Sequence, residues 1–199
     1  MAYLVLTDFL DVVSKSGSPK ATKVKELKHR PPYSPATDFY KPLRDGLVAI
    51  HKNGKAKSAL QLLLPTMKDK KKHSNYPPAL VGYRKWWGNK SFIWFDPPYG
   101  AYSKLGFDIG VNPELGLEFL GQRHAIKLYL KDEALTKLRV DLITGLMSYV
   151  LSPLAGSNVI MSVLDVRRSK LISGSANVAG LMPIVDAELS YIATLWPSV

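Results

Sequence analysis

The sequence predicts an α+β fold in which a basic helical N-terminal portion packs with a mixed, largely antiparallel sheet flanked by helices. Three observations lead to this prediction. Apolar residues recur at helical spacing through much of residues 1–90, and the spacing changes towards two after Gly88. A long amphipathic segment, a nearly continuous apolar run and a last helical pattern then follow the alternating segments.

The start of the chain predicts one short helix and one basic arm. Residues 4–13 form an apolar segment that we expect to be helical. Residues 14–28 hold five lysines and few apolar side chains, which indicates a basic loop or flexible arm. A proline-rich stretch, residues 31–35, predicts a stiff connector after it.

Three further helices are expected before residue 90, at residues 38–52, 58–64 and 77–87. The first is the clearest, because Phe39, Leu43, Leu47 and Ile50 recur at helical spacing. A basic loop at residues 68–73 separates the second and third helices.

The second half predicts the sheet. Four strands are expected at residues 91–95, 104–111, 115–120 and 124–131, with Gly121-Gln122 as a tight hairpin turn between the last two. A long helix at 135–151, a buried strand at 157–166 and a closing helix at 181–196 complete the order. We expect residues 1–90 and 91–199 to form one folding unit, as the length of 199 residues suits one domain.

Composition narrows the function classes. The chain has no cysteine, which excludes disulfides, thiolate metal sites and cysteine nucleophiles. Two aspartates interrupt the first apolar stretch, so it does not have the pattern of a secretory signal. Later apolar stretches fall short of the ~20 residues that cross a bilayer. We therefore expect a soluble, cytoplasmic protein without a membrane partner.

The charge is unevenly distributed. Of the formal net charge of +11, residues 1–90 contribute +12 from 18 Lys/Arg and 6 Asp/Glu, and residues 91–199 contribute −1. Such asymmetry indicates a polyanionic partner. The alternative is that the charge only keeps the protein soluble.

Basic and aromatic residues interleave between positions 68 and 102. Lysine and arginine neutralise phosphates, and aromatic rings stack on unpaired bases. Two adjacent tryptophans, 86 and 87, point about 100° apart on a helix, so we expect at least one near the surface. We predict binding of DNA or RNA with little sequence preference, through Lys68, Lys70, Lys71, Lys72, Arg84, Lys85, Trp87 and Lys90.

The order of helix, strands, helix and strand over residues 36–170 resembles the core of PD-(D/E)XK nucleases. The resemblance implies a Mg²⁺-dependent nuclease in which Asp108 and Glu118 bind the metal and Lys127 helps position the attacking water, with Glu114 as another available carboxylate. The acid that this family places two residues before the lysine is absent, because position 125 is alanine. The alternative reading of these residues is the polar outer face of a half-buried sheet.

Three other readings remain open. Asp96-Pro97-Pro98-Tyr99 resembles the catalytic tetrapeptide of amino-methyltransferases, but no glycine-rich turn after a strand accompanies it, so a prolyl turn is the favoured explanation. Asp165, Arg167 and Arg168 end the buried strand, where sites are common in sheet proteins, but an Arg–Asp ion pair that caps the sheet is the favoured explanation. The basic face could instead bind an acidic protein, as a non-catalytic subunit. No cofactor is expected unless the chain is a nuclease.

Overall fold

The computed structural model describes residues 2–35, 38–64, 70–156, 158–174 and 178–199, and it confirms the α+β class. The helices are α1 (Leu6–Val13), α2 (Gly17–Lys28), α3 (Lys41–Lys52), the 3-10 helix η1 (Lys57–Leu63), α4 (Lys70–Trp87), α5 (Lys137–Ala155) and α6 (Val178–Leu195). The strands are β1 (Ala2–Val5), β2 (Ile93–Trp94), β3 (Gly100–Lys104), β4 (Phe107–Val111), β5 (Leu115–Phe119), β6 (Gln122–Tyr129), β7 (Val159–Asp165) and β8 (Lys170–Ser173).

The strands form two mixed sheets, where the sequence led us to expect one. The smaller sheet has the order β1-β4-β3, and the larger has the order β2-β5-β6-β7-β8. The predicted strand at 104–111 divides because Leu105 and Gly106 adopt positive φ angles of 53° and 79°, which turns the chain back between β3 and β4. In the larger sheet, β6 and β7 are parallel and α5 connects them.

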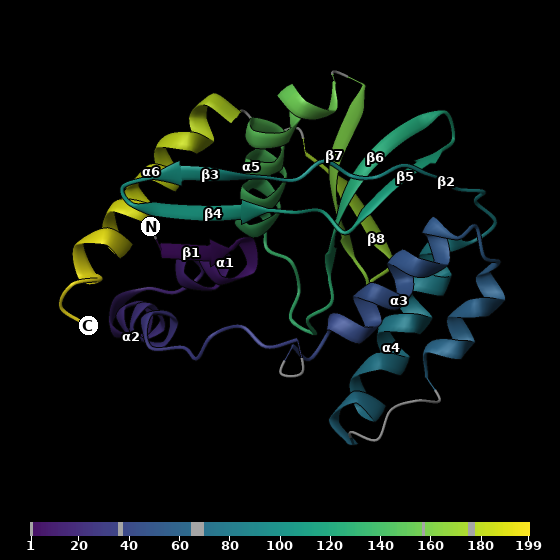
Figure 1. Cartoon of the computed structure of the whole chain (residues 1–199), viewed down its shortest axis with the longest axis horizontal. Coiled ribbons are helices and arrows are strands. Elements are labelled where there is room, and N and C mark those ends of the chain that lie inside the picture. Colours follow the sequence, from purple (N-terminus) through teal and green to yellow (C-terminus); the bar gives the residue numbers. More distant parts are fainter. Residues whose placement is uncertain (1, 36–37, 65–69, 157, 175–177) are drawn as a thin grey trace.

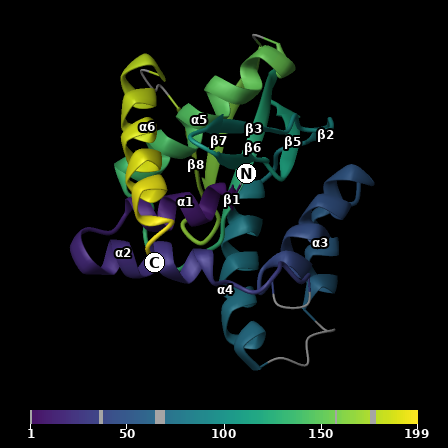
Figure 2. The same ribbon diagram turned by 60° about the vertical axis from the view of Figure 1, so that its left-hand side comes forward.

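Helices cover both faces of the larger sheet. Ile126 and Leu128 point to the cluster that contains α3 and α4, whereas Ala125 and Tyr129 point to the cluster that contains α5. Figure 1 shows α5 beside the larger sheet, with α3 and α4 at the opposite end of the molecule from α6, and the rotated view in Figure 2 keeps this arrangement. The outer face of β6 is therefore buried rather than open to water, because α5 covers it.

The basic arm predicted at residues 14–28 is wrong, because this segment contains helix α2. Only Val24 and Leu27 are buried on α2, too few for a clear amphipathic pattern. Contacts made elsewhere in the chain hold the helix: Lys20 forms a 2.5 Å ion pair with Glu188 of α6, and Lys28 donates to the Trp196 carbonyl at 2.7 Å. Tertiary contacts thus outweigh weak local periodicity.

Two smaller corrections concern strands. Residues 2–5 form β1, which pairs in parallel with β4, so the first predicted helix starts only at Leu6. The sequence also missed β8, a four-residue strand that pairs with β7. Both are edge strands, and strands this short carry too few alternating residues to be recognised.

The two hydrophobic clusters each draw on both sides of residue 90. One joins β1, α1 and α2 to β4, α5 and α6, and the other joins α3 and α4 to β5, β6 and β7. The basic helical portion therefore does not have a core of its own. Residues near the N-terminus pack instead with the last helix, beside which both chain ends lie in Figure 1.

Two helices, α5 and α6, are long and apolar enough to cross a membrane by length and composition alone. Buried residues make up 44% of the α5 window and 28% of the α6 window. α5 packs against β3, β4, β7 and α6, as the core helix of a folded domain does, and such helices pass the same test. The cytoplasmic location stays a prediction.

Helix α4 approaches the turn between β7 and β8 very closely at Gly82. A Cβ atom at this position would lie 2.1 Å from the Val166 carbonyl oxygen and 2.9 Å from that of Arg167. Both obstacles are backbone atoms, so α4 would have to move. We expect Gly82→Ala to lower the free energy of unfolding by at least about 2 kcal/mol in urea denaturation.

The matched control is Val81→Ala on the exposed face of the same turn, where the side chain is 68% exposed. Its effect should stay within about 0.5 kcal/mol. Equal stabilities of the two variants would contradict this packing of α4.

Candidate functional site

Four cationic side chains gather at the C-terminal end of α4. Arg84 and Lys85 are exposed, and neither side chain forms an ion pair within the described part of the chain. Lys57 donates to the Gly88 carbonyl at 2.6 Å, and Lys90 donates to the Trp86 carbonyl. We name Lys57, Arg84, Lys85 and Lys90 the α4 cationic surface. The last turn of a helix carries partial negative charge, which stabilises these cations there.

Part of the predicted nucleic-acid site cannot be placed. Lys68 lies outside the described residues, as do the side chains of Lys70, Lys71 and Lys72. The backbone of these last three residues forms the start of α4. The basic loop predicted at 68–73 is therefore helical from residue 70 onwards.

Trp87 does not lie at the surface. It is 8% exposed and Trp86 is 5% exposed, so the prediction that one of these rings is near the surface is wrong. Trp87 stacks on His51 at 4.5 Å between ring centroids, and Trp86 stacks on Phe92 at 5.3 Å. The two rings diverge as expected, but α3 covers one direction and the sheet covers the other. Trp87 therefore has no free face for a base.

His51 forms the polar centre of this aromatic cluster. Its Nε2 lies 2.6 Å from the Tyr83 hydroxyl, and both side chains are buried. Burial lowers the pKa of His51 to about 4. Because an imidazolium here would be desolvated without a counter-charge, the folded protein holds His51 neutral.

Lys127 lies beside Glu114, not beside the other residues predicted to act with it. Its ammonium donates to Glu114 Oε1 at 2.7 Å and to the Asn112 carbonyl at 2.9 Å. Glu114 Oε2 accepts from the Leu128 N–H at 2.7 Å. The side chains of Lys127 and Glu114 are only 9% and 13% exposed, so this pair is largely desolvated. Loss of one partner from such a pair is costly.

Asp108 and Glu118 lie apart from Lys127. Asp108 is on β4 in the smaller sheet, where it accepts from the Ser103 hydroxyl at 2.6 Å. Glu118 pairs with Arg123 across the hairpin, four residues from Glu114 along β5, a separation of about 13 Å. In the described ranges, no three or more His, Cys, Asp or Glu side chains group as metal ligands would.

The hairpin turn lies one residue earlier than the sequence predicted. Leu120 and Gly121 form the turn, with positive φ angles of 50° and 73°, and Gln122 already pairs with Phe119. A turn at Gly121-Gln122 would place Gly116 opposite Lys127, whereas one step beyond the observed Leu115–Ile126 pair places Glu114 there. The predicted turn therefore gave no reason to choose Glu114 over Glu118.

Residues 96–99 follow β2, a two-residue strand that pairs antiparallel with β5 at the edge of the larger sheet. Asp96 accepts from Lys52 at 3.1 Å and from the Trp94 indole at 3.2 Å, and Tyr99 is 81% exposed. Residues 96–99 form an irregular connection from β2 to β3 that is neither a hydrogen-bonded turn nor a bend, so the prolyl turn favoured from the sequence is not formed.

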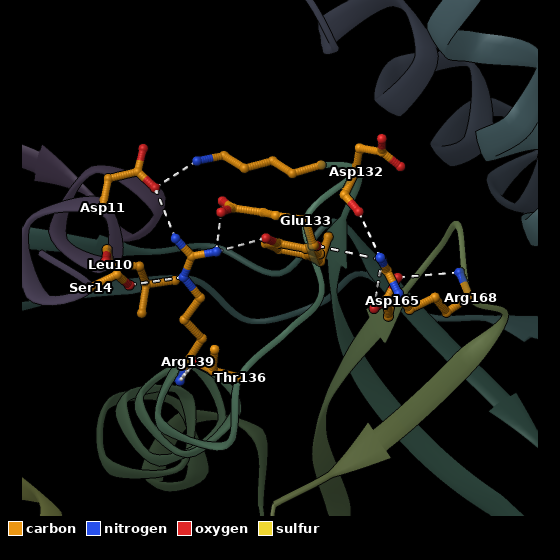
Figure 3. A network of polar contacts seen from close by, with 11 residues as sticks. Leu10, Asp11, Ser14, Asp132, Glu133, Thr136, Arg139, Asp165 and Arg168 are labelled. Atoms are coloured by element: carbon orange, nitrogen blue, oxygen red, sulfur yellow. Dashed lines mark hydrogen bonds and ion pairs between the residues drawn. The ribbon is translucent and has the colours of Figure 1, made fainter.

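Polar contacts gather at the carboxyl ends of the parallel strands β6 and β7. Arg168 Nη1 lies 3.5 Å from Asp165 Oδ2, so the expected ion pair forms. On the other side of this edge, Arg139 of α5 reaches Glu133 and approaches Asp11 of α1 (Figure 3). Glu133 follows β6 on the loop that leads into α5.

The sequence analysis missed a polar cavity at this place. The cavity has a volume of about 710 Å³ and lies between α1, α2 and the loop from β6 to α5. The residues that line it are Asp11, Ser14, Lys15, Ser18, Pro19, Thr22, Lys23, Glu26, Lys131, Glu133 and Arg139. The segment 14–28 was expected to be an arm, so the sequence provided no reason to place it over the strand ends.

His51 predicts a pH dependence of stability. Its pKa of about 4 in the folded protein lies below the ordinary 6.5, so the unfolded chain takes up a proton first as the pH falls. The stabilisation is complete above about pH 6.5 and is lost as the pH falls towards 4. His51→Gln keeps a hydrogen-bonding group near Tyr83 and removes the titration. Between pH 7 and 4.5 the free energy of unfolding should fall in both proteins. The fall should be about 2–3 kcal/mol larger in the wild type than in His51→Gln.

Urea denaturation at several pH values measures this difference. The pKa of His124 is also lowered by burial, and this histidine titrates in both proteins, so it cancels in the comparison. Parallel pH profiles for wild type and His51→Gln would contradict a neutral buried His51.

Comparison with known proteins finds no family model, no curated protein and no solved structure that matches this chain. The function is therefore inferred from the charges, contacts and cavities of the chain itself.

Proposed function

We propose that the protein binds nucleic acid with little sequence preference through the α4 cationic surface. The observation that carries the proposal is the exposure of Arg84 and Lys85, adjacent cations with no ion-pair partner in the part of the chain that is described. The backbone of α4 also carries lysines at residues 70–72, and its axis measures about 22 Å from residue 70 to residue 85. A helix with cations at both ends suits a polyanion that extends along it.

Several other cations of the first ninety residues are less available, whereas Lys15, Lys25 and Lys55 are exposed and form no ion pair within the described residues. Arg30 makes two hydrogen bonds to Asp8, and Lys20 and Lys52 form ion pairs with Glu188 and Asp96. A carboxylate beside a cation reduces its attraction for phosphate, because the pair presents little net charge. The charge asymmetry of the sequence is thus concentrated onto fewer side chains, among which Arg84 and Lys85 are prominent.

The mode of binding should be electrostatic. Trp86 and Trp87 are buried, so stacking on unpaired bases has little support near this surface. Phosphate contacts alone carry no sequence information, and they make affinity fall as salt rises. We therefore expect duplex DNA to bind at least as well as a single strand of the same length, because its charge density is higher.

The charge-reversal variant Arg84→Glu/Lys85→Glu tests the proposal. Fluorescence anisotropy with a labelled duplex should show at least about tenfold weaker binding at low salt. The slope of log affinity against log salt should become shallower by about 2, since two phosphate contacts are lost.

The matched control is Lys25→Glu/Lys137→Glu, which changes the net charge equally on the exposed faces of α2 and α5. Lys25 forms no ion pair within the described residues, and Lys137 pairs with Asp141 one turn along its own helix while its side chain stays 88% exposed. It should bind within about threefold of wild type under the same conditions, because long-range effects are screened. Equal losses in the two variants would contradict a localised surface. Binding to an acidic protein but not to any nucleic acid would favour the interaction-subunit alternative instead.

One observation favours the nuclease alternative as a second candidate, namely the contact between Glu114 and Lys127. Mg²⁺ is commonly held by one or two carboxylates together with substrate phosphates, and Glu114 is the carboxylate that is near Lys127. The metal would polarise a phosphate and lower the pKa of a bound water. Both oxygens of Glu114 are already hydrogen-bonded, one to Lys127 and one to the Leu128 N–H, so Mg²⁺ would have to displace Lys127 to bind this carboxylate.

Cleavage of plasmid, single-stranded DNA and RNA in Mg²⁺ tests this candidate. Glu114→Gln should abolish cleavage, and its circular dichroism and urea denaturation must match those of the wild type, because loss of this buried ion pair is costly by itself. Asp108→Asn should leave cleavage unchanged, because Asp108 lies in the other sheet. No cleavage of any substrate by the wild type would remove the candidate.

A further inference from the structure

The polar cavity between α1, α2 and the loop from β6 to α5 has the size and chemistry of a ligand site. Its volume of about 710 Å³ falls within the range of small-molecule pockets. Its lining is polar: four cations and three carboxylates, with the hydroxyls of Ser14, Ser18 and Thr22. Such a wall suits a ligand that carries charge and hydroxyl groups rather than an apolar one.

Arg139 is fixed in the wall of this cavity. Its side chain is only 9% exposed, and its Nε donates to the Ser14 hydroxyl at 2.8 Å while Nη1 donates to the Tyr129 hydroxyl at 2.9 Å. Burial raises the pKa of Tyr129 to about 12, so this hydroxyl remains protonated and neutral. The guanidinium is thus held in one orientation before any ligand binds, which lowers the entropy cost of binding.

The other terminal nitrogen of Arg139, Nη2, makes no hydrogen bond to another described residue. Nη2 lies 3.9 Å from Asp11 Oδ1, which is longer than a hydrogen bond. Nη1 contacts Glu133 Oε1 at 2.6 Å, and Glu133 is 52% exposed on its loop, so an anion could displace it (Figure 3). A planar guanidinium with open donors matches the oxygens of phosphate or carboxylate.

Two lysines complete the positive side of the cavity. Lys15 is exposed, and its ammonium has no carboxylate partner in the described ranges. Lys131 contacts Asp11 at 2.6 Å, so Asp11 balances Lys131 rather than Arg139. A divalent cation would face Lys15, Lys131 and Arg139, and their repulsion makes it an unsuitable ligand.

The carboxylates of the cavity can accept hydrogen bonds from a ligand that carries hydroxyl groups. Asp11, Glu26 and Glu133 are acceptors, and the hydroxyls of a sugar are donors. A phosphate that contacts Arg139 and Lys15 would leave the attached sugar near the carboxylates. The ligand would then use both the cations and the carboxylates of the cavity. The geometry points to a binding site for a phosphomonoester of a hydroxyl-bearing group such as a nucleoside.

This site lies on α1, α2 and α5 and does not rest on the proposed function of the α4 cationic surface. The phosphomonoester could be a free small molecule or the phosphorylated end of a nucleic-acid strand, since both present the same group. Isothermal titration calorimetry with AMP, adenosine and two short oligonucleotides separates these sources. The oligonucleotides share one sequence and differ only in a 5′-phosphate or a 5′-hydroxyl.

AMP should bind at least tenfold more tightly than adenosine. Tighter binding of the 5′-phosphorylated oligonucleotide than of its 5′-hydroxyl form would identify the strand end as the source. Equal binding of the two oligonucleotides, with AMP retained, would identify a free phosphomonoester. No binding of AMP, or equal binding of AMP and adenosine, would overturn the proposal.

Lys15→Glu and Lys25→Glu form the matched pair of variants. Both lysines are exposed and unpaired within the described residues, but only Lys15 lines the cavity. Lys15→Glu should weaken AMP binding at least tenfold, and Lys25→Glu should change it less than twofold. Equal effects would overturn the site, even if Arg84→Glu/Lys85→Glu still lost duplex binding.

Arg139→Lys tests whether binding needs the planar guanidinium of Arg139 and not only its positive charge. It keeps the charge but removes the open guanidinium donors, so AMP binding should fall while circular dichroism remains that of the wild type. If this variant does not fold, the lysine pair still decides the proposal.

Discussion

The packing of α4 against the larger sheet is the constraint on which the rest of the structure depends. Gly82 allows the helix backbone to approach the turn between β7 and β8. One turn further along α4, Trp86 packs on Phe92 and Phe119, and Trp87 packs on His51. The same helix therefore buries its aromatic residues and turns Arg84 and Lys85 outward. Burial of aromatic area is the driving force, and the cationic surface is what remains exposed.

The sequence predicted the parts of the fold that have strong periodicity. The α+β class, α3, the antiparallel β5 and β6, α5 and the buried β7 follow from spacing, although the hairpin turn lies one residue before the predicted one. α2, β1 and β8 did not, because α2 is held by contacts such as Lys20 with Glu188 and the two strands are short edges. Local propensity has little weight where tertiary contacts supply most of the stability.

The candidate sites also differ in how much of each could be predicted from the sequence. Exposure of Arg84 and Lys85 could be predicted from their position on a helix. The burial of Trp87 could not, because it depends on how α3 and the larger sheet pack around the end of α4. The contact of Lys127 with Glu114 depends on the hairpin register, and the turn predicted at Gly121-Gln122 would have moved the partner of Lys127 by two residues, to Gly116. Arg139 and the cavity could not be found in this way, since they depend on α2 lying over the strand ends.

An NMR titration of isotope-labelled protein with a short duplex locates the surface that binds nucleic acid. Backbone amide shifts should move first and most at residues 81–90, around Arg84 and Lys85, and the aromatic signals of Trp87 should keep their buried environment. Shifts confined to other elements, or none at a duplex concentration that saturates binding in anisotropy, would contradict the assignment of this surface.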